Sequence, residues 1–428
     1  MSTAIVLYSR DLRVHDHAAL TAATTEHEQV VPMFVLDEAL LRAAGTPNRM
    51  SFLLDSLHAL RASLRELGGD LVVRRGEVVA EVVRIASATR ATTLFVGEDA
   101  SAYAQQRLRR LREQLEVRIE NTVTAVAPGE LAPEGRDHYR VFTPYWRRWR
   151  EEPRPPIAGP PPRVKLPRLE AGRLPELSQL VAEPPSPDLP KGGEAEARRR
   201  LEHWLADGTA DYDTARDDLA ANRTSRLSPY LHFGCISANE VATRAGNAAL
   251  VRQLCWRDFY TQLLAANPHT AHEDLHKRRQ PWNDDNEALA RWRAGCTGVP
   301  IVDAGMRQLH TEGWMHNRAR LIVAAFLTKT LGLDWRAGAR TFGELLVDAD
   351  VANNSGNWQW VAGTGVDMRP NRLFNPQAQA RRHDPNGDYV RRYVPELAEL
   401  HGAAVHEPWR APLASVAPEY PQPLAPVP

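Results

Sequence analysis

Residues 1 to about 130 alternate short apolar runs with amphipathic segments. The segment MSFLLDSLHALRASLRELGG (50–69) repeats apolar residues at helical spacing and ends on glycine, which predicts an amphipathic helix. Four shorter runs are typical of buried strands: AIVLYS (4–9), VVPMFVLD (30–37), DLVVRRG (70–76) and TTLFVGED (92–99). Strands that alternate with helices predict an α/β domain built on a doubly wound parallel sheet.

The pattern changes after this region. Twelve prolines lie between positions 153 and 190, and that density predicts a long surface linker without compact elements. From about residue 194 the apolar spacing is helical with few strand signals. We therefore expect three parts: an α/β domain over 1–130, a proline-rich interdomain linker over 131–193, and a mostly α-helical domain over 194–428.

Composition narrows the class of protein. Acidic and basic residues balance at 53 each, so no general coat of positive charge is available for nucleic acid or membranes, although a local basic patch is compatible with this balance. The three cysteines form no C-x-x-C pair, which favours a reducing compartment. The first residues, MSTAIVLYSRDLRVHD, do not resemble a signal peptide, and no apolar run is long enough to span a bilayer. We expect a soluble cytoplasmic protein.

Two segments of the second half combine structural and functional residue types. TSRLSPYLHFG (224–234) places hydroxyls before a predicted helix, where they either cap the helix or help to bind a phosphate. VRQLCWRDFY (251–260) places four side chains on one helical stripe: Gln253, Trp256, Arg257 and Tyr260. The aromatic members are typical of a core, whereas the amide and the guanidinium favour a ligand-facing stripe.

A second pair of segments raises the same choice. GWMHNRARL (313–321) puts Asn317 and Arg320 on one helical face, and DADVANNSGNWQW (348–360) supplies carboxylates and amides before two tryptophans. Residues two apart on a helix point ~200° apart, so Trp358 and Trp360 should face different surroundings. One indole is then able to line a pocket while the other packs elsewhere, although packing alone also explains both.

Other motifs carry less weight. HEDLH (272–276) matches the H-E-x-x-H pattern, but no third ligand follows in a supporting pattern, so we expect no metal site. YWRRWR (145–150) interleaves arginine with aromatics, as single-strand binders do, and interdomain packing explains it equally well. No G-x-G-x-x-G follows the first strand, and no P-loop, nucleophile elbow or convincing acid–base pair is visible, which favours chemistry carried by a cofactor.

Taken together, the order of these segments resembles the DNA photolyase/cryptochrome family, specifically its class I cyclobutane pyrimidine dimer photolyases. The matching segments are LYSRDLRVHDHAAL, VFTPYWRRW, TSRLSPYLHFG, WRDFY, TGVPIVDAGMRQLHTEGWMHNRAR, LTKTLGLDWRAGARTF, NWQW, RLFNP and YVPEL. The resemblance implies light-driven repair of DNA, in which excited FADH⁻ donates an electron to the dimer, the ring splits and the electron returns. It also implies FAD in the helical domain and an antenna chromophore in the α/β domain.

The resemblance assigns roles to individual residues. The implied FAD contacts are Tyr212, Thr224, Ser225, Arg226, Leu227, Ser228, Arg320, Asp348, Ala349, Asp350 and Asn354, with Arg320 pairing with Asp348 and Asn354 facing the flavin N5. The implied contacts to DNA and to the flipped dimer are Arg216, Gln253, Trp256, Arg257, Asn317, Arg318 and Trp360. An implied electron-transfer chain runs through Trp358, Trp335 and Trp282.

The sequence departs from the family pattern at some positions, and other functions within the family are also compatible with it. Gln253 stands where many class I members have Glu, and Leu321 stands where Met is usual, while Asn317 favours cyclobutane dimers over (6-4) products. Arg49, Asp99 and Tyr103 resemble an antenna site for 8-hydroxy-5-deazaflavin, with methenyltetrahydrofolate as the alternative. The expected partner is UV-damaged DNA, with no membrane, and the family suggests a monomer. The alternatives are a cryptochrome-like blue-light receptor and a (6-4) photolyase.

Overall fold

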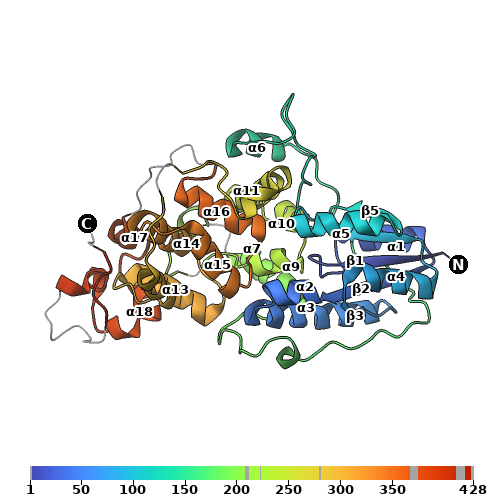
Figure 1. Ribbon diagram of the computed structural model, residues 1–428, viewed down its shortest axis with the longest axis horizontal. Coiled ribbons are helices and arrows are strands. Elements are labelled where there is room, and N and C mark those ends of the chain that lie inside the picture. Colours follow the sequence, from blue (N-terminus) through green and yellow to red (C-terminus); the bar gives the residue numbers. More distant parts are fainter. Residues whose placement is uncertain are drawn as a thin grey trace. The chain divides into compact units, whose positions relative to one another are not determined.

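The N-terminal part of the computed structural model is a five-stranded parallel sheet in the order β3–β2–β1–β4–β5 (Figure 1). The structure describes residues 2–207, 212–221, 223–278, 281–366, 375–410 and 420–425. The strands are β1 (Thr3–Tyr8), β2 (Gln29–Asp37), β3 (Val72–Gly76), β4 (Thr93–Gly97) and β5 (Glu116–Glu120). The expected α/β sheet domain is confirmed, and a helix-rich part follows it in the chain.

Burial explains why four strands were visible in the sequence. Every residue of β1 is buried, and its register pairs Ile5 with Val31 on one side and with Leu94 on the other. Parallel strands covered on both faces form continuous apolar runs of this kind. The fifth strand, β5, lies at the sheet edge with alternating charged residues that are largely exposed, and this polar pattern gave no strand signal.

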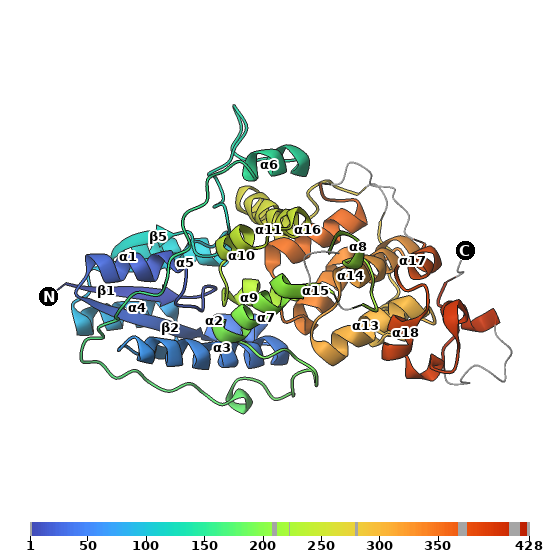
Figure 2. The same cartoon turned by 180° about the vertical axis from the view of Figure 1, so that it is seen from behind.

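Helices and a long irregular segment cover the sheet. The helices of this part are α1 (Ala18–Glu26), α2 (Glu38–Ala44), α3 (Pro47–Glu66), α4 (Val78–Thr89), α5 (Ala102–Arg112) and α6 (Phe142–Trp149). The expected linker over 131–193 therefore contains one helix, α6, and its proline-rich part from 153 to 190 contains only the short 3₁₀ turn η1 (Leu177–Gln179) and runs along the sheet domain (Figure 2). This segment accepts backbone hydrogen bonds from the sheet domain, from Val30 N to Lys165 O (3.0 Å) and from Val73 N to Ala171 O (2.7 Å). Its residue Val164 is fully buried.

The chain divides into two compact units, each built from several segments. The first unit comprises Met1–Pro184, Pro190–Thr209 and Ser225–Pro268. It therefore includes α7 (Glu194–Asp207), α9 (Ser228–Phe233), α10 (Ala238–Arg244) and α11 (Ala248–Ala266), which the expected boundary at residue 193 would group with the C-terminal domain.

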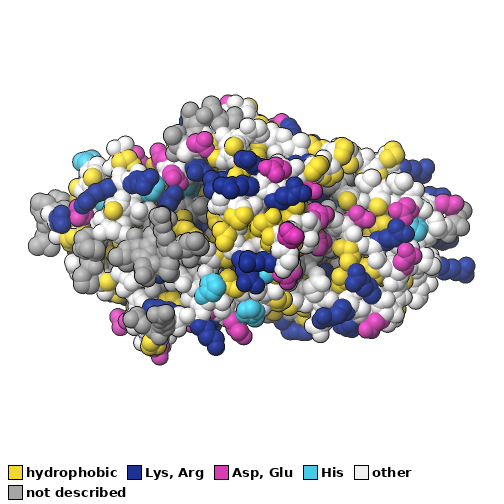
Figure 3. All heavy atoms as spheres, turned by 90° about the horizontal axis from the view of Figure 1, so that it is seen from above, with side chains coloured by type: hydrophobic (Ala, Val, Ile, Leu, Met, Phe, Trp, Pro, Cys, Tyr) yellow, Lys and Arg dark blue, Asp and Glu magenta, His cyan; other side chains and the backbone are white. Residues whose placement is uncertain are grey.

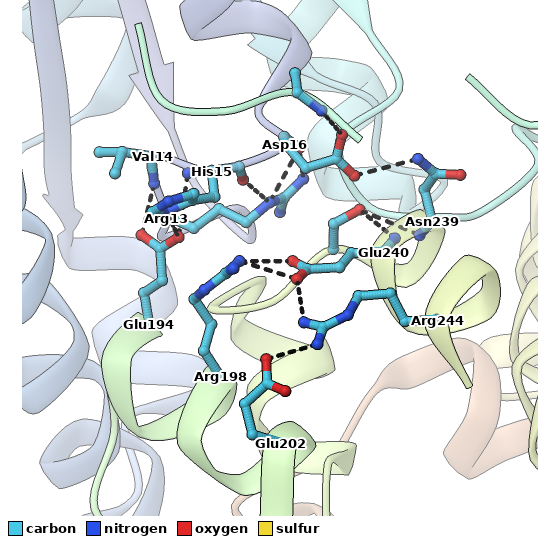
Figure 4. Close-up of polar contacts among 12 residues, drawn as sticks. Arg13, Val14, His15, Asp16, Glu194, Arg198, Glu202, Asn239, Glu240 and Arg244 are labelled. Carbon is cyan, nitrogen blue, oxygen red and sulfur yellow. Dashed lines mark hydrogen bonds and ion pairs between the residues drawn. The ribbon is translucent and has the colours of Figure 1, made fainter. Parts of the chain in front are cut away.

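A buried polar network explains why these helices group with the sheet (Figure 4). The carboxylate of Glu194 on α7 accepts from the backbone N–H of Val14 (2.8 Å) and His15 (3.1 Å). Arg13 is 1% exposed, and its guanidinium donates to four backbone oxygens, those of His15, Asp16, Thr122 and Gly234. Buried charges that are fully hydrogen-bonded fix the segments that contribute them, because losing one partner leaves the other charge desolvated.

The same network continues between helices α7 and α10. Glu240 on α10 accepts two hydrogen bonds from Arg198 (3.0 and 2.9 Å) and one from Arg244 (3.1 Å), and Arg244 also binds Glu202 (2.6 Å) (Figure 4). Helices α7 and α10 are thus held to each other by charge-assisted bonds.

The second unit comprises Pro185–Leu189, Ala210–Thr224 and His269–Pro428. Its described helices are α8 (Tyr212–Ala215), α12 (Asn286–Ala294), α13 (Pro300–Glu312), α14 (Asn317–Ala325), the π-helix η3 (Phe326–Thr330), α15 (Trp335–Leu345), α16 (Val351–Ala362), α17 (Pro376–His383) and α18 (Asp388–Tyr393). Short 3₁₀ turns lie at η2 (Pro268–Ala271), η4 (Pro395–Leu397), η5 (Gly402–His406) and η6 (Pro408–Arg410). One hydrophobic cluster joins these helices and includes the fully buried Trp292 and the nearly fully buried Trp335.

Two further observations concern the charge on the surface and the apolar length of the helices. Lys and Arg side chains are scattered among acidic and apolar ones over the face drawn in Figure 3. Within the described part of the chain, no helix combines the length and the apolar character needed to cross a membrane.

Candidate functional site

A hollow in the second unit gathers many of the predicted cofactor contacts. It has an empty volume of about 510 Å³ and is lined by residues of α14, α15 and α16 and of the loop that precedes α16. Among its lining residues are seven that the sequence singled out: Asn317, Arg320, Asp348, Ala349, Asp350, Asn354 and Trp358. Leu321 also lines it, in the place where a methionine is usual in the related family.

An ion pair dominates the polar side of this hollow. Arg320 Nη2 lies 2.8 Å from Asp348 Oδ2, so the predicted pairing of the two residues is present. Arg320 Nε also donates to the backbone oxygen of Met315 (2.8 Å), which fixes the direction of the guanidinium. The second carboxylate oxygen, Asp348 Oδ1, is buried and has no hydrogen-bond partner within the described residues. A buried acceptor left in this state favours a ligand that donates to it.

The start of α16 positions the amide residues. Asp350 is the N-cap of this helix and accepts from Asn353 N (2.8 Å), so its carboxylate serves the fold as well as lining the hollow. One turn later, Asn354 Nδ2 donates to Ala339 O (2.9 Å). One N–H of this amide is used by α15, so its oxygen and its second N–H are left for a ligand.

The two tryptophans of α16 have different surroundings, as their spacing predicted. Trp358 is 2% exposed and lines the hollow, and its Nε1 is buried without a partner among the described residues. Its ring packs edge-on against Phe342 (centroids 5.0 Å apart) and Trp292 (6.1 Å). Trp360 is half-buried and does not line this hollow, so the two indoles do not share one pocket.

The other two tryptophans of the expected chain have charged neighbours. Trp335 is 1% exposed and its Nε1 donates to Asp274 Oδ1 (2.8 Å). The guanidinium of Arg336 also binds Asp274 (2.9 Å) and lies 5.0 Å from the centre of the Trp335 ring. Trp282 is half-buried, with the guanidinium of Arg278 3.6 Å above its ring. All three tryptophans of the expected chain belong to or pack against one hydrophobic cluster.

The H-E-x-x-H segment has a structural role here. Residues 272–276 form bends rather than a helix, so their side chains do not share the helical face that this motif requires. Gln359 of α16 binds the segment, because its amide nitrogen donates to Thr270 O (2.8 Å) and Glu273 O (3.1 Å) and its oxygen accepts from Leu275 N (2.8 Å).

The segment around α8 contains Tyr212 and Arg216, which were expected to meet FAD and DNA. Tyr212 is buried, and burial raises its pKa. Arg216 is half-buried, and Arg318 Nη2 donates to Asp217 (2.6 Å). Partial burial opposes ionisation of Asp217, but its bond to Arg318 prevails and lowers its pKa. Asp217 was not anticipated, although its place beside Arg216 offered a signal.

The 224–228 segment departs from the capping expectation. Helix α9 starts at Ser228, and its N-cap is Leu227, which makes no side-chain cap. The alternative of a hydroxyl cap does not hold for α9, because Thr224 and Ser225 precede its N-cap and Ser228 is already its first residue. Thr224 Oγ1 is buried without a partner among the described residues, and Arg226 adopts a left-handed backbone with φ of 50°. Both features are common where a loop meets a ligand.

Helix α11 presents the expected stripe with graded exposure. Gln253 is exposed, Trp256 is half-buried and Tyr260 is buried. The guanidinium of Arg257 donates to the backbone oxygens of Val123 (2.8 Å) and Leu231 (3.1 Å), which favours a role in holding α11. The exposed end of the stripe is the part open to a substrate.

The carboxyl ends of the central strands form a second polar site. Asp99 lies 3.9 Å from Arg10, and the Tyr103 hydroxyl donates to Asp37 at the end of β2. Burial and this bond raise the pKa of Tyr103 to about 12. Arg49 donates to Ala44 O (2.6 Å), and burial lowers its pKa to about 10.

Arg10 and Asp99 follow β1 and β4, between which the strand order reverses, and that is where open α/β sheets bind ligands. Arg10 and Asp37 were missed at the sequence level. Each directly follows or ends a predicted strand, and that position was the available signal.

Comparison with known proteins identifies the class. The chain matches two family models, "DNA photolyase" over residues 4–163 and "FAD binding domain of DNA photolyase" over residues 250–427. The chain therefore belongs to the DNA photolyase and cryptochrome family, and it carries that family's FAD-binding domain.

Individual relatives show how close the match is. A deoxyribodipyrimidine photo-lyase of Streptomyces griseus is 49% identical over 96% of this chain and 93% of its own length. A cryptochrome DASH of Gloeobacter violaceus is 36% identical over 95% of this chain and 88% of its own. The crystal structure of a class III photolyase from Agrobacterium tumefaciens superposes with a TM-score of 0.92 at 34% identity, covering 100% of this chain and 95% of that one.

Proposed function

We propose that this chain is a deoxyribodipyrimidine photo-lyase of the class I type, which repairs cyclobutane pyrimidine dimers in DNA under light. The observation that carries the proposal is the hollow beside the Arg320–Asp348 ion pair, within the segment that matches an FAD-binding domain. The similarity to the Streptomyces griseus photo-lyase supports the reaction.

The residues of the hollow fit a flavin. Asp348 Oδ1 and Trp358 Nε1 are buried polar atoms without partners among the described residues, one an acceptor and the other a donor. Arg320 supplies positive charge for an anionic ring, and the oxygen of Asn354 is left to accept from a ring N–H. When bound, reduced FAD supplies the light-driven electron that opens the cyclobutane ring. Tyr212 and residues 224–228 would hold the rest of the cofactor.

The lesion is assigned to residues with exposed polar or aromatic surface. These are Gln253, Trp256, Asn317 and Trp360. An indole gives a flipped base an apolar wall, and an amide reads its carbonyl edge. A dimer stacks and pairs poorly, so extruding it costs less than extruding an intact base. Arg216 and Arg318 would meet phosphates, which makes binding sensitive to salt.

Three tryptophans are assigned to electron transfer, namely Trp358, Trp335 and Trp282. Their membership of one apolar cluster, from a buried member at the hollow to a half-buried one, supports this order. Trp282→Phe should slow photoreduction of oxidised FAD and leave repair by already reduced protein unchanged. Photoreduction at the wild-type rate would remove Trp282 from the chain.

An antenna chromophore is assigned to the switch point of the sheet, at Arg49, Asp99 and Tyr103 together with Arg10 and Asp37. We propose 8-hydroxy-5-deazaflavin, with methenyltetrahydrofolate as the alternative. The crystal structure of an archaeal photolyase from Sulfolobus tokodaii, 30% identical with a TM-score of 0.88, contains two FAD molecules. Mass spectrometry of the chromophore released from purified protein identifies it.

Repair is tested directly. Purified protein is incubated with DNA that contains thymine dimers, under blue light and in the dark, and the remaining dimers are counted. Light-dependent loss of dimers is expected. Loss of (6-4) products instead would reassign the substrate, and no loss of either lesion by FAD-loaded protein would overturn the proposal.

A blue-light receptor is the second candidate, because cryptochrome DASH proteins and a Synechocystis cryptochrome structure match nearly the whole chain. The repair assay separates the two functions. A receptor would undergo the light-driven change of flavin absorbance without removing dimers, whereas a photolyase does both. We propose that the repair enzyme acts as a monomer, and sedimentation of the FAD-loaded protein tests this.

A further inference from the structure

A pair of stacked rings lies behind the exposed stripe of α11. The rings of Phe142 and Trp256 are nearly parallel, with an interplanar angle of 4° and centroids 3.6 Å apart. Phe142 is the first residue of α6 and is 6% exposed, whereas Trp256 is half-buried. Phe142 therefore covers one face of the indole.

Further rings hold the edges of the same indole. Phe259, one turn along α11 and fully buried, meets Trp256 edge-on at 87° (5.6 Å), and Tyr260 lies tilted beside it (5.6 Å). Phe259 also meets Phe142 at 83° (5.7 Å). Since each contact fixes a different direction, the indole plane has little freedom to tilt.

Helix α6 is itself anchored to α11. Its residues 142, 145 and 149 lie on one stripe at helical spacing. The Tyr145 ring packs on Phe259 (5.5 Å), and Trp149 Nε1 donates to the buried carboxylate of Asp258 (3.0 Å). The Arg252 guanidinium lies 5.4 Å from the centre of the Phe142 ring. Phe142 is thus held in place from both helices.

We infer that Phe142 is a positioning residue for the lesion pocket: it backs one face of Trp256 so that only the opposite face is open to an extruded base. The inference rests on the proposed function, because it names how the Trp256 wall of that site is oriented. An indole that could tilt would present its plane to a base only part of the time, and ordering it on binding would weaken affinity.

The test measures binding in the dark rather than repair. The dissociation constant of the FAD-loaded protein is determined for an oligonucleotide duplex with one thymine dimer and for the same duplex without it. Phe142→Leu removes the stack and should weaken dimer binding roughly 2- to 12-fold, the range of an aromatic pair, while undamaged duplex binds as before. Phe142→Tyr keeps the ring and should restore the preference.

Two controls separate positioning from general packing. Phe95→Leu removes a fully buried ring from β4, where it packs on His27 and touches neither α6 nor Trp256, so it should lower thermal stability and leave dimer affinity unchanged. In a Trp256→Ala background, Phe142→Leu should cost no further affinity, because it acts through the missing indole. Near-UV circular dichroism should change with Phe142→Leu in the wild type and not in the Trp256→Ala background.

The outcomes are distinguishable. Wild-type protein that binds both duplexes equally would overturn the proposed function itself. A wild type that prefers the dimer, with Phe142→Leu showing the same preference, would overturn the role of Phe142. Equal losses of dimer affinity from Phe142→Leu and Phe95→Leu, or an additive loss in the Trp256→Ala background, would mean that Phe142 acts only as a core residue.

Discussion

At the scale of single residues, the pairing of Arg320 with Asp348 is the feature on which the candidate cofactor site depends most. We predict that Asp348→Asn lowers FAD affinity about tenfold or more, because hydrogen bonds to charged groups contribute ~1.5–3 kcal/mol and Arg320 would lose its counter-charge. Flavin-to-protein absorbance after dialysis measures the loss.

An exposed ion pair provides the matched control for this change. Asp388→Asn breaks the surface pair with Arg391 (2.6 Å) and should leave FAD content unchanged. Full retention of FAD by Asp348→Asn would mean that the Asp348 carboxylate does not contribute to the cofactor site.

A second residue-scale prediction concerns Trp335. In the proposed electron-transfer chain, positive charge on this indole would be stabilised by Asp274, 2.8 Å from Nε1, and opposed by Arg336. Asp274→Asn should therefore slow photoreduction of FAD about fivefold, equivalent to ~1 kcal/mol of screened charge interaction, and Arg336→Gln should speed it. Transient absorption of the tryptophan radical follows both variants. Shifts in the same direction in the two variants would contradict the electrostatic explanation.

At the scale of elements, the approach of α15 to α16 depends on one missing side chain. A Cβ at Gly338 would lie 2.2 Å from Trp358 Cη2 and 2.7 Å from Leu327 Cδ2. We predict that Gly338→Ala destabilises the protein by ~1–3 kcal/mol and lowers FAD content, because Trp358 is displaced toward the hollow. Thermal unfolding and flavin absorbance measure the two effects.

The same helix contains the control for this prediction. A Cβ at Gly343 would have no atom within 4 Å. Because alanine favours a helix more than glycine does, Gly343→Ala should stabilise α15 by roughly 0.5–1 kcal/mol. If both alanine variants retained wild-type stability and FAD, the close contact at Gly338 would not limit this packing.

Elements with strong periodicity were predictable and weakly patterned ones were not. The strands β1, β2 and β4 follow from their apolar runs, because burial on both faces favours continuous apolar sequence, and α3 follows from its helical spacing. The two edge strands differ: β3 keeps two buried valines, whereas β5 alternates charged residues that are largely exposed and gives no apolar run. The stack of Phe142 on Trp256 joins residues more than a hundred positions apart, and no local pattern encodes such a contact.

At the scale of the whole molecule, buried carboxyl groups set how stability depends on pH. Burial raises the pKa of Asp258 to about 6 and that of Glu98 to about 7, and it also raises the pKa of Asp303 and Asp384. Ion pairs act the other way on Asp70, whose pKa is lowered although burial opposes it. As pH rises, the acids with raised pKa values lower the free energy of unfolding, whereas Asp70 raises it.

Asp258 is the acid with a raised pKa that can be tested on its own. It is 1% exposed, and its Oδ2 accepts from Ala125 N, Val126 N and Trp149 Nε1. Its folded pKa lies above its unfolded value, so the folded state binds the extra proton. The stability that this proton provides is complete below about pH 4 and is lost as pH rises toward about 6.

We therefore predict that Asp258 lowers the free energy of unfolding by about 2 kcal/mol between about pH 4.5 and about pH 7. Asp258→Asn cannot ionise, so the difference in stability between wild type and variant should shift by that amount across this interval, with the variant gaining relative to the wild type as pH rises. Denaturant unfolding of both proteins at the two pH values measures it, and subtracting the variant removes the contributions of Glu98, Asp303 and Asp384. A difference that stays constant with pH would show that the three donors to Oδ2 keep Asp258 ionised in the fold, and that its hydrogen bonds outweigh its burial.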